Sequence, residues 1–248
     1  MTVQIQTKRS KPYLKAIIYS DQGIGKTTLA VSGNKHPELA ETLLVNIDKG
    51  DLSIDGMNID MATIGTDASG ASTKSIVKDL MDIVIACLTK KPGFEKYKTI
   101  VVDTITELQA KDLEDISNGR EMLTQQDYGK STKKLKAFCA LIRDAPINII
   151  LTAQVRRVMD GPQEAKKLTE IRPDITEAAC NSIMAAVNFV WFLYVPEATK
   201  ERTLITKNTG VVRGKTRNEK FQTLIGEKVE RPNLAEIYDK LLKATEQQ

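Results

Sequence analysis

Apolar, β-prone runs alternate with stretches of helical periodicity along most of this chain. The apolar runs lie at 42–47, 98–103, 147–154 and 186–195, and the helical patterns lie around 73–90, 105–117 and 125–144. Runs that are apolar throughout and rich in Val and Ile are typical of strands buried on both faces of a parallel sheet. The alternation therefore predicts a single α/β domain over residues 1–248, with a mostly parallel sheet flanked by helices.

After residue 200 the apolar runs become shorter and closer together. Segments 203–207, 210–216 and 221–226 follow one another, with Asn and Gly residues at the breaks. This spacing predicts antiparallel hairpin strands late in the chain. The last amphipathic stretch predicts a C-terminal helix within 232–248.

Two polar segments fall outside this alternation. Residues 1–12 contain Lys8, Arg9 and Lys11 and no acidic residue, which predicts a basic N-terminal arm. Residues 155–178 follow an apolar run directly, and loops of this length in a compact domain are usually functional or disordered. We therefore expect 155–178 to be a mobile loop. Its basic residues are Arg156, Arg157, Lys166, Lys167 and Arg172.

The stretch YSDQGIGKTTLA, residues 19–30, connects an apolar run to a helical pattern. It matches the phosphate-binding loop G-x-x-x-x-G-K-[ST], except that serine replaces the first glycine. Backbone N–H groups at such a strand-to-helix turn attract a polyphosphate. A glycine-containing turn with a chance GKT is the alternative interpretation. The predicted nucleotide-binding residues are Ser20, Asp21, Gln22, Gly23, Ile24, Gly25, Lys26, Thr27 and Thr28.

Three side chains have predicted roles toward phosphates and a metal. Lys26 would contact the β- and γ-phosphates, and the Thr27 hydroxyl would bind Mg²⁺. The apolar run at 98–103 ends in Asp103. A carboxylate at the carboxyl end of a parallel strand can also hold the Mg²⁺ ion.

Two further strand ends carry candidate residues for hydrolysis. Asp48 follows the apolar run at 42–47, and we predict that it polarises the attacking water as a general base. A simple turn at Asp48 is the alternative. Gln154 closes the run at 147–154 and is predicted to sense the γ-phosphate, with a plain strand cap as the alternative.

Composition excludes several classes of protein. With 41% hydrophobic and 27% charged residues, the chain is typical of a soluble globular domain. The sequence contains neither an apolar run long enough for a membrane span nor the apolar segment of a signal peptide, so we expect a cytoplasmic protein. A single histidine excludes zinc sites built from several histidines and argues against a Ser-His-Asp triad. Three scattered cysteines are expected to be buried and reduced.

The net charge of +4 is modest, but the basic residues are unevenly distributed. Residues 1–20 contain four basic residues and no acidic one, and residues 207–220 contain five basic residues against Glu219. Such clusters attract polyanions, although a solvated basic face explains them as well.

The order of these motifs resembles that of one family. The GKT loop is followed by Asp48, by VVDTITEL, by QQDYGKSTKKLKAFCALIRDAPINIILTAQ and by a late GKTR. Over most of residues 13–220 this order resembles the RecA/RadA-like P-loop ATPases encoded by phages, in particular the Sak-type single-strand annealing proteins. The resemblance implies a RecA-like core, ATP and Mg²⁺ as ligands, and DNA annealing or recombination for a phage or prophage inside a bacterial host cell.

The resemblance also implies partners. Single-stranded DNA would bind loops near the ATP-sensing strand ends. Lys215 and Arg217 match a Lys-x-Arg that reaches the ATP site of a neighbouring subunit, so the protein would form a ring or filament with the ATP site at the interface. A single-stranded-DNA-binding protein is a further expected partner. The DNA contacts are assigned to Arg156, Arg157, Lys166 and Lys167.

Two departures from the family keep alternatives open. Relatives usually carry Glu where this chain has Asp48, so a module in which ATP gates DNA binding or assembly with negligible turnover is the main alternative to a DNA-stimulated ATPase. None of the five phenylalanines begins the Phe-x-x-Ala motif by which longer RadA-like recombinases polymerise. A small-molecule kinase would instead need an arginine-rich lid, for which Arg156, Arg157 and Arg172 are candidates.

Overall fold

The computed structural model describes residues 12–48, 54–65 and 75–246. The strands are β1 (Lys15–Ser20), β2 (Thr42–Asn46), β3 (Asp60–Ala62), β4 (Thr99–Asp103), β5 (Asn148–Asp160), β6 (Lys167–Pro173), β7 (Phe189–Tyr194), β8 (Thr203–Ile205), β9 (Lys215–Thr216) and β10 (Lys228–Glu230). The helices are α1 (Lys26–Val31), α2 (Ile76–Leu88), α3 (Ile105–Ser117), α4 (Gln125–Asp144), α5 (Glu177–Ala186), α6 (Glu219–Ile225) and α7 (Leu234–Glu246), with short 3₁₀ turns at Ser32–Lys35 and Gln163–Ala165.

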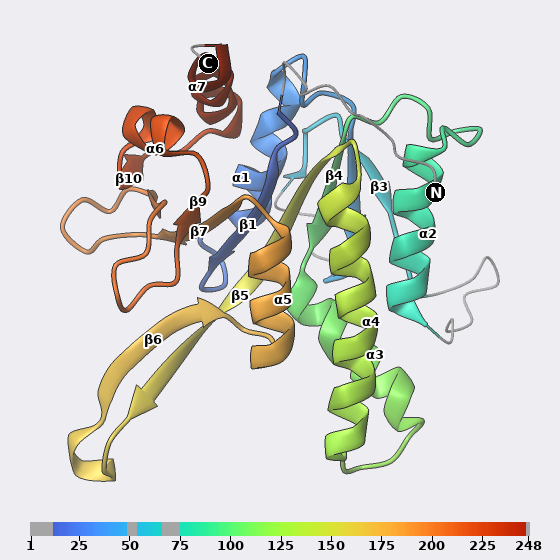
Figure 1. Cartoon of the computed structure of the whole chain (residues 1–248), viewed down its shortest axis with the longest axis vertical. Coiled ribbons are helices and arrows are strands. Elements are labelled where there is room, and N and C mark those ends of the chain that lie inside the picture. Colours follow the sequence, from blue (N-terminus) through green and yellow to red (C-terminus); the bar gives the residue numbers. More distant parts are fainter. Residues whose placement is uncertain (1–11, 49–53, 66–74, 247–248) are drawn as a thin grey trace, which may run out of the picture.

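One sheet runs through the domain in the strand order β10-β8-β7-β1-β5-β4-β2-β3, and β6 and β9 pair with β5 and β7 (Figure 1). The pairings among β3, β2, β4, β5, β1 and β7 are parallel. The pairings made by β6, β8, β9 and β10 are antiparallel. The predicted α/β fold, mostly parallel with antiparallel strands late in the chain, is therefore confirmed.

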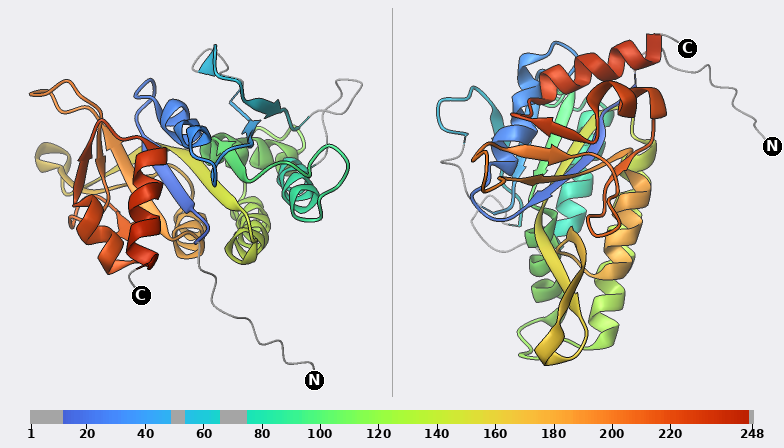
Figure 2. Two further views of the ribbon diagram at one scale, coloured as in Figure 1. Left: turned by 90° about the horizontal axis from the view of Figure 1, so that it is seen from above. Right: turned by 90° about the vertical axis from the view of Figure 1, so that its left-hand side faces the viewer.

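Helices cover both faces of this sheet, as the views in Figures 1 and 2 make clear. Residues of α2, α3, α4 and α5 pack in one hydrophobic cluster, and residues of α1, α6 and α7 pack in the other. Within β1, Ile17 and Tyr19 belong to the first cluster and Ala16 and Ile18 to the second, and all four are 0% exposed. Burial on both faces explains why this strand is apolar at every position. Among the described helices, none combines the length and apolar character needed to cross a membrane.

Most predicted elements lie where the sequence placed them. The helical patterns at 105–117 and 125–144 correspond to α3 and α4, and the final helix is α7. The cysteines at 87, 139 and 180 are buried and unpaired, as expected. The basic arm predicted for 1–12 lies outside the described residues except for Pro12.

The segment 155–178 is not the loop that its sequence suggested. β5 continues to Asp160 and pairs with β6 in an antiparallel hairpin, after which α5 begins. The outer part of β5 is exposed or half-buried rather than alternating between buried and exposed positions. Without an alternating apolar face, the sequence carries no strand signal, so we expected a loop. The hairpin projects from the carboxyl edge of the sheet (Figures 1 and 2).

The late apolar segments also differ from the prediction. Of residues 221–226, expected as a strand, the first five belong to helix α6, and Gly226 caps its carboxyl end. The Asn218 side chain caps this helix by accepting a hydrogen bond from the Phe221 N–H at 2.9 Å, and Phe221 and Ile225, four residues apart, are both buried. Of 210–216, only the last two residues form a strand, β9.

Asn148, at the start of β5, connects three backbone segments. The side chain is only 4% exposed. Its Nδ2 donates to the Glu38 carbonyl at 3.0 Å and to the Lys98 carbonyl at 2.9 Å, and its Oδ1 accepts from the Leu14 N–H at 2.8 Å. The amide thus provides hydrogen-bond partners for three backbone groups near the amino ends of β1, β4 and β5.

We therefore expect Asn148→Ala to lower the free energy of unfolding by about 2–4 kcal/mol, because buried backbone groups lose their partners. Urea unfolding monitored by circular dichroism measures this change. The matched control is Asn58→Ala at an exposed position, which should change stability by less than about 0.5 kcal/mol. An equally small change for Asn148→Ala would contradict the bridging role.

Candidate functional site

The loop between β1 and α1 has the backbone of a phosphate-binding turn. Gly23 and Gly25 have φ angles of 73° and 98°, a region that residues with a side chain rarely adopt. Ser20 instead continues β1, where it pairs with Gln154, and its hydroxyl donates to the Asp21 carbonyl at 2.8 Å. A residue in regular strand geometry does not require glycine, so serine fits at the first position of the motif.

Lys26 folds back over this loop. Its Nζ donates to the Asp21 carbonyl at 2.9 Å and to the Ser20 carbonyl at 3.3 Å, and the residue is 8% exposed. Burial lowers the pKa of Lys26, and the carboxylates of Asp103, Asp48 and Asp21 oppose this shift. The amine therefore has to exchange loop carbonyls for phosphate oxygens when it binds a nucleotide.

Thr27, Asp103 and Thr152 form a short chain of hydrogen bonds. The Thr27 hydroxyl donates to Asp103 Oδ2 at 2.7 Å, and the Thr152 hydroxyl donates to Asp103 Oδ1. Asp103 is 4% exposed, and each of its two carboxylate oxygens accepts a hydrogen bond from one of these hydroxyls. A hydroxyl and a carboxylate are oxygen ligands of the kind that Mg²⁺ prefers. The two residues predicted to bind the metal, Thr27 and Asp103, are thus in contact.

A cavity of about 380 Å³ brings most of the predicted residues together. Asp48 lines it from the end of β2, Asp103 from the end of β4 and Gln154 from β5. Because parallel strands end at the same edge of a sheet, residues far apart in the chain meet here. The loop and helix residues that also line the cavity are Gln22, Gly23, Gly25, Lys26, Thr27, Thr28 and Thr104.

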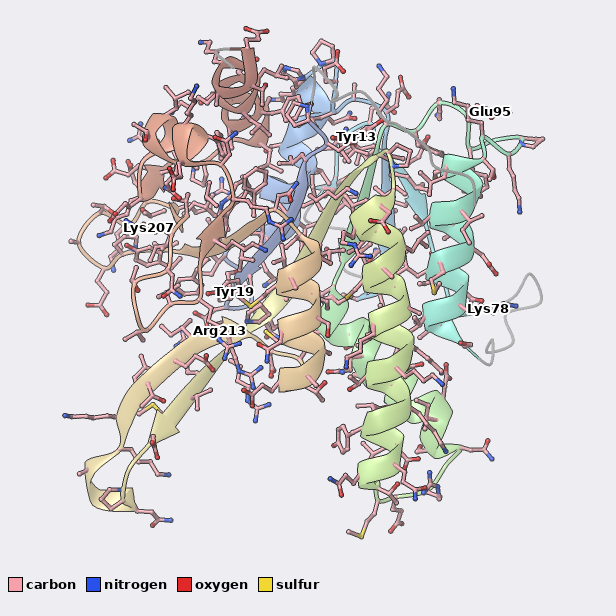
Figure 3. All side chains as sticks on the ribbon, in the orientation of Figure 1. Tyr13, Tyr19, Lys78, Glu95, Lys207 and Arg213 are labelled. Carbon is pink, nitrogen blue, oxygen red and sulfur yellow. The ribbon has the colours of Figure 1, made fainter. Side chains whose placement is uncertain are left out.

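A second cavity lies at the opposite edge of the sheet and contains none of these residues. It measures about 430 Å³ and is lined by Tyr13, Tyr97 and Tyr238 among others. Figure 3 labels Tyr13 at this upper edge and Tyr19 toward the other end of β1. The candidate nucleotide site is thus confined to the carboxyl edge.

The predicted DNA-binding cations lie on the β5–β6 hairpin, and two of them are paired. Arg157 forms a two-pronged ion pair with Asp21 of the phosphate loop, with Nη1–Oδ1 and Nη2–Oδ2 distances of 2.7 and 2.6 Å. These hydrogen bonds from Arg157 lower the pKa of Asp21. Arg156 lies 3.7 Å from Asp174, whereas Lys166 and Lys167 are exposed at the outer end of the hairpin. The hairpin is therefore linked directly to the phosphate loop.

The base of the hairpin is attached to the strand that precedes the phosphate loop. The buried Tyr19 hydroxyl donates to the Arg213 carbonyl at 2.6 Å and to the Ile171 carbonyl at 3.2 Å. Burial raises the pKa of Tyr19, so the phenol stays a donor. The Arg213 guanidinium in turn pairs with Glu170 on β6. Figure 3 shows Tyr19 and Arg213 next to each other at this junction.

Lys215 and Arg217 both contact the end of α5 in their own chain. Lys215 Nζ donates to the Met184 and Val187 carbonyls, the latter at 2.8 Å, and burial lowers its pKa to about 8. Arg217 Nη2 donates to the Ala185 carbonyl at 2.9 Å. Cations at a helix carboxyl end are stabilised by its free carbonyls. Their predicted role in a neighbouring subunit stays a prediction.

Sequence reasoning missed Arg202, whose side chain lies against the phosphate loop. A Cβ built on Gly25 would lie 2.6 Å from Arg202 Nη1. Arg202 immediately precedes β8, and β8 pairs with β7, the strand next to β1. Only this strand order brings the residue to the loop, and no motif around ERTLITK signals it.

The match to a known protein family agrees with this geometry. The family described as AAA domain matches residues 13–218. A search of curated proteins finds no significant match. A solved structure of a KaiC-like protein from the hyperthermophilic archaeon Pyrococcus horikoshii OT3 is similar over 79% of each chain, with 12% sequence identity and a TM-score of 0.45. The family match and the strand topology confirm the predicted RecA-like P-loop fold class. The chain therefore belongs to the AAA domain family and is a P-loop ATPase by family.

Proposed function

We propose that this protein is a Mg²⁺-dependent ATPase that binds single-stranded DNA and promotes annealing or recombination, in a phage or prophage as the family resemblance suggests. One observation carries the nucleotide part: Lys26, Thr27 and Asp103 line a single cavity with Asp48 and Gln154. These are the groups that phosphoryl transfer to water requires, namely a phosphate cradle, metal ligands, a base and a water-orienting amide.

Each residue has a defined task in this reaction. Lys26 would neutralise charge on the terminal phosphates. Thr27 and Asp103 would hold Mg²⁺ through their oxygen atoms, and the metal would supply positive charge that stabilises the phosphoryl group during transfer. Asp48 accepts the proton of the attacking water. The Gln154 amide orients that water without adding a charge, because it is neutral.

Asp48 also supports a second candidate function. Its carboxylate is one methylene shorter than the Glu of related ATPases, and the residue is exposed. A base that approaches water poorly gives slow turnover, and ATP then acts as a switch for DNA binding or assembly. Steady-state hydrolysis with and without single-stranded DNA separates the two, since only the ATPase is stimulated by DNA.

The basic hairpin is the proposed DNA site. Arg156, Lys166 and Lys167 extend from the carboxyl edge, close in sequence to Gln154, and are exposed. Arg157 is already paired with Asp21, so it has to give up a carboxylate before it binds a DNA phosphate. The hairpin thus offers Lys166 and Lys167 at its outer end, Arg156 beside Asp174, and Arg157, which depends on the phosphate loop.

For the nucleotide site, we expect Lys26→Ala to weaken ATP binding at least about tenfold and to abolish hydrolysis, because charge-assisted contacts to phosphate are lost. Calorimetric titration and phosphate release measure the two effects. Lys91→Ala, at an exposed turn after α2, is the control that should leave both unchanged. Normal binding and turnover in Lys26→Ala would refute the phosphate-loop assignment.

For the metal, Thr152→Val should raise the Mg²⁺ concentration for half-maximal hydrolysis by about tenfold, because the Asp103 carboxylate loses the hydroxyl that orients it. A Mg²⁺ titration of the hydrolysis rate measures this shift. Thr89→Val, at an exposed position, is the control. If Thr152→Val and Thr89→Val both keep the wild-type midpoint of the Mg²⁺ titration, Asp103 does not hold the metal.

For DNA, the triple variant Arg156→Ala/Lys166→Ala/Lys167→Ala should bind single strands more weakly and reduce the log–log salt slope by about 2, since each lost phosphate contact removes about 0.7. Fluorescence anisotropy at several salt concentrations measures the slope. The double variant Lys91→Ala/Lys243→Ala changes exposed lysines elsewhere and should keep it. An unchanged slope in the triple variant would eliminate the hairpin as the DNA site.

For assembly, we propose that Arg217 completes the ATP site of a neighbouring subunit. Lys26→Ala and Arg217→Ala should each be inactive alone, and their mixture should regain part of the ATPase activity, because one protomer then supplies an intact loop and another an intact arginine. Hydrolysis at the wild-type rate by Arg217→Ala alone would exclude the role in trans. An inactive variant that mixing does not rescue would assign Arg217 to its own chain, where it already contacts α5.

A further inference from the structure

Arg202 covers one side of the phosphate loop of its own chain. A Cβ on Gly25 would lie 2.6 Å from Arg202 Nη1, 3.5 Å from Cδ and 3.6 Å from Cζ. The guanidinium group therefore occupies the space that a side chain at residue 25 would need. The φ of 98° at Gly25 favours glycine by itself, and the 2.6 Å approach shows that the Arg202 guanidinium lies directly against the loop.

The backbone around Arg202 fixes where this side chain starts. The Arg202 carbonyl accepts from the Arg231 N–H at 2.8 Å, and the next residue, Thr203, pairs with Glu230 of β10. The edge of the sheet thus holds Arg202 in position beside the loop. No rearrangement of the strands is needed to bring its guanidinium to a ligand at Gly25.

The acidic residue next to Arg202 is already paired with another arginine. The Arg231 guanidinium binds the Glu201 carboxylate and lowers its pKa. Among the residues that the structure describes, no hydrogen bond or ion pair engages the Arg202 guanidinium, and the residue is exposed. Its donors are consequently available for an anion from outside the chain.

Arg202 lines a further cavity, which shares Thr28 with the phosphate cavity. This further cavity measures about 510 Å³. A ligand that extended from the phosphate loop past Thr28 into this further cavity would therefore meet Arg202. The guanidinium has planar paired donors that match the oxygens of a phosphate group.

We propose that Arg202 is a nucleotide-binding residue supplied by the same chain, and that its guanidinium binds the phosphate groups of the nucleotide seated in the phosphate loop. This inference rests on the proposed nucleotide function and adds a second cation to Lys26. Arginines supplied from the same chain and from a partner are both used by nucleotide hydrolases. The proposed role of Arg202 therefore does not depend on whether Arg217 acts across an interface.

The test compares Arg202→Gln with Lys200→Gln, which removes a positive charge from the same turn. Calorimetric titration with ATP, ADP, AMP and adenosine in the presence of Mg²⁺ gives the affinities. Arg202→Gln should weaken ATP and ADP binding by about 10–100-fold and adenosine binding hardly at all, as expected for a lost charge-assisted contact. Lys200→Gln should stay within about twofold of the wild type, and Arg202→Lys should recover part of the affinity.

The possible failures are distinguishable. If wild-type protein binds ATP and Arg202→Gln binds it equally well, this inference is overturned while the proposed function stands. If Lys26→Ala retains full affinity, the proposed function itself fails. Equal losses for ATP and adenosine would assign Arg202 to the ribose or base and overturn the phosphate assignment. Equal losses in Arg202→Gln and Arg202→Lys would indicate a packing role and overturn it as well.

Discussion

The hydrogen bond from the Thr27 hydroxyl to the Asp103 carboxylate, at 2.7 Å, joins the start of α1 to the end of β4. These residues meet only because β1, β5 and β4 are consecutive parallel strands, so their carboxyl ends lie at one edge. Both faces of these strands are buried, so the strands lie at the centre of the domain with helices on either side. The positions of the candidate nucleotide cavity, the candidate base and the candidate sensing amide all follow from this alignment.

Asp21 connects the phosphate loop to the β5–β6 hairpin. Its carbonyl accepts a hydrogen bond from Lys26, and its carboxylate pairs with Arg157 on the hairpin. A ligand that draws Lys26 toward phosphate oxygens therefore acts on the same residue that holds a hairpin cation. The nucleotide site and the proposed DNA site share one residue, which provides a physical route by which each affects the other.

The sequence predicted the features whose signals are local. The phosphate loop was predicted from its motif, and Asp103 and Gln154 were predicted from their positions at the end of apolar runs. Gln154 lies within β5 rather than at its end, because the strand continues to Asp160. Arg202 and the Arg157–Asp21 pair could not be predicted in this way, because both depend on which strands become neighbours. The hairpin was missed because its exposed strands lack an alternating face. Helix α6 was not predicted because its residues favour β-structure. The signals for a helix were the Asn218 cap and two buried residues spaced four apart.

A structure of the protein with Mg²⁺ and a non-hydrolysable ATP analogue tests the central claim most directly. The account predicts that the phosphates lie in the loop, that Lys26 leaves the Ser20 and Asp21 carbonyls for the terminal phosphates, and that Mg²⁺ lies beside Thr27 and Asp103. An analogue bound away from this cavity, or Lys26 still bonded to the two carbonyls with phosphates present, would contradict it.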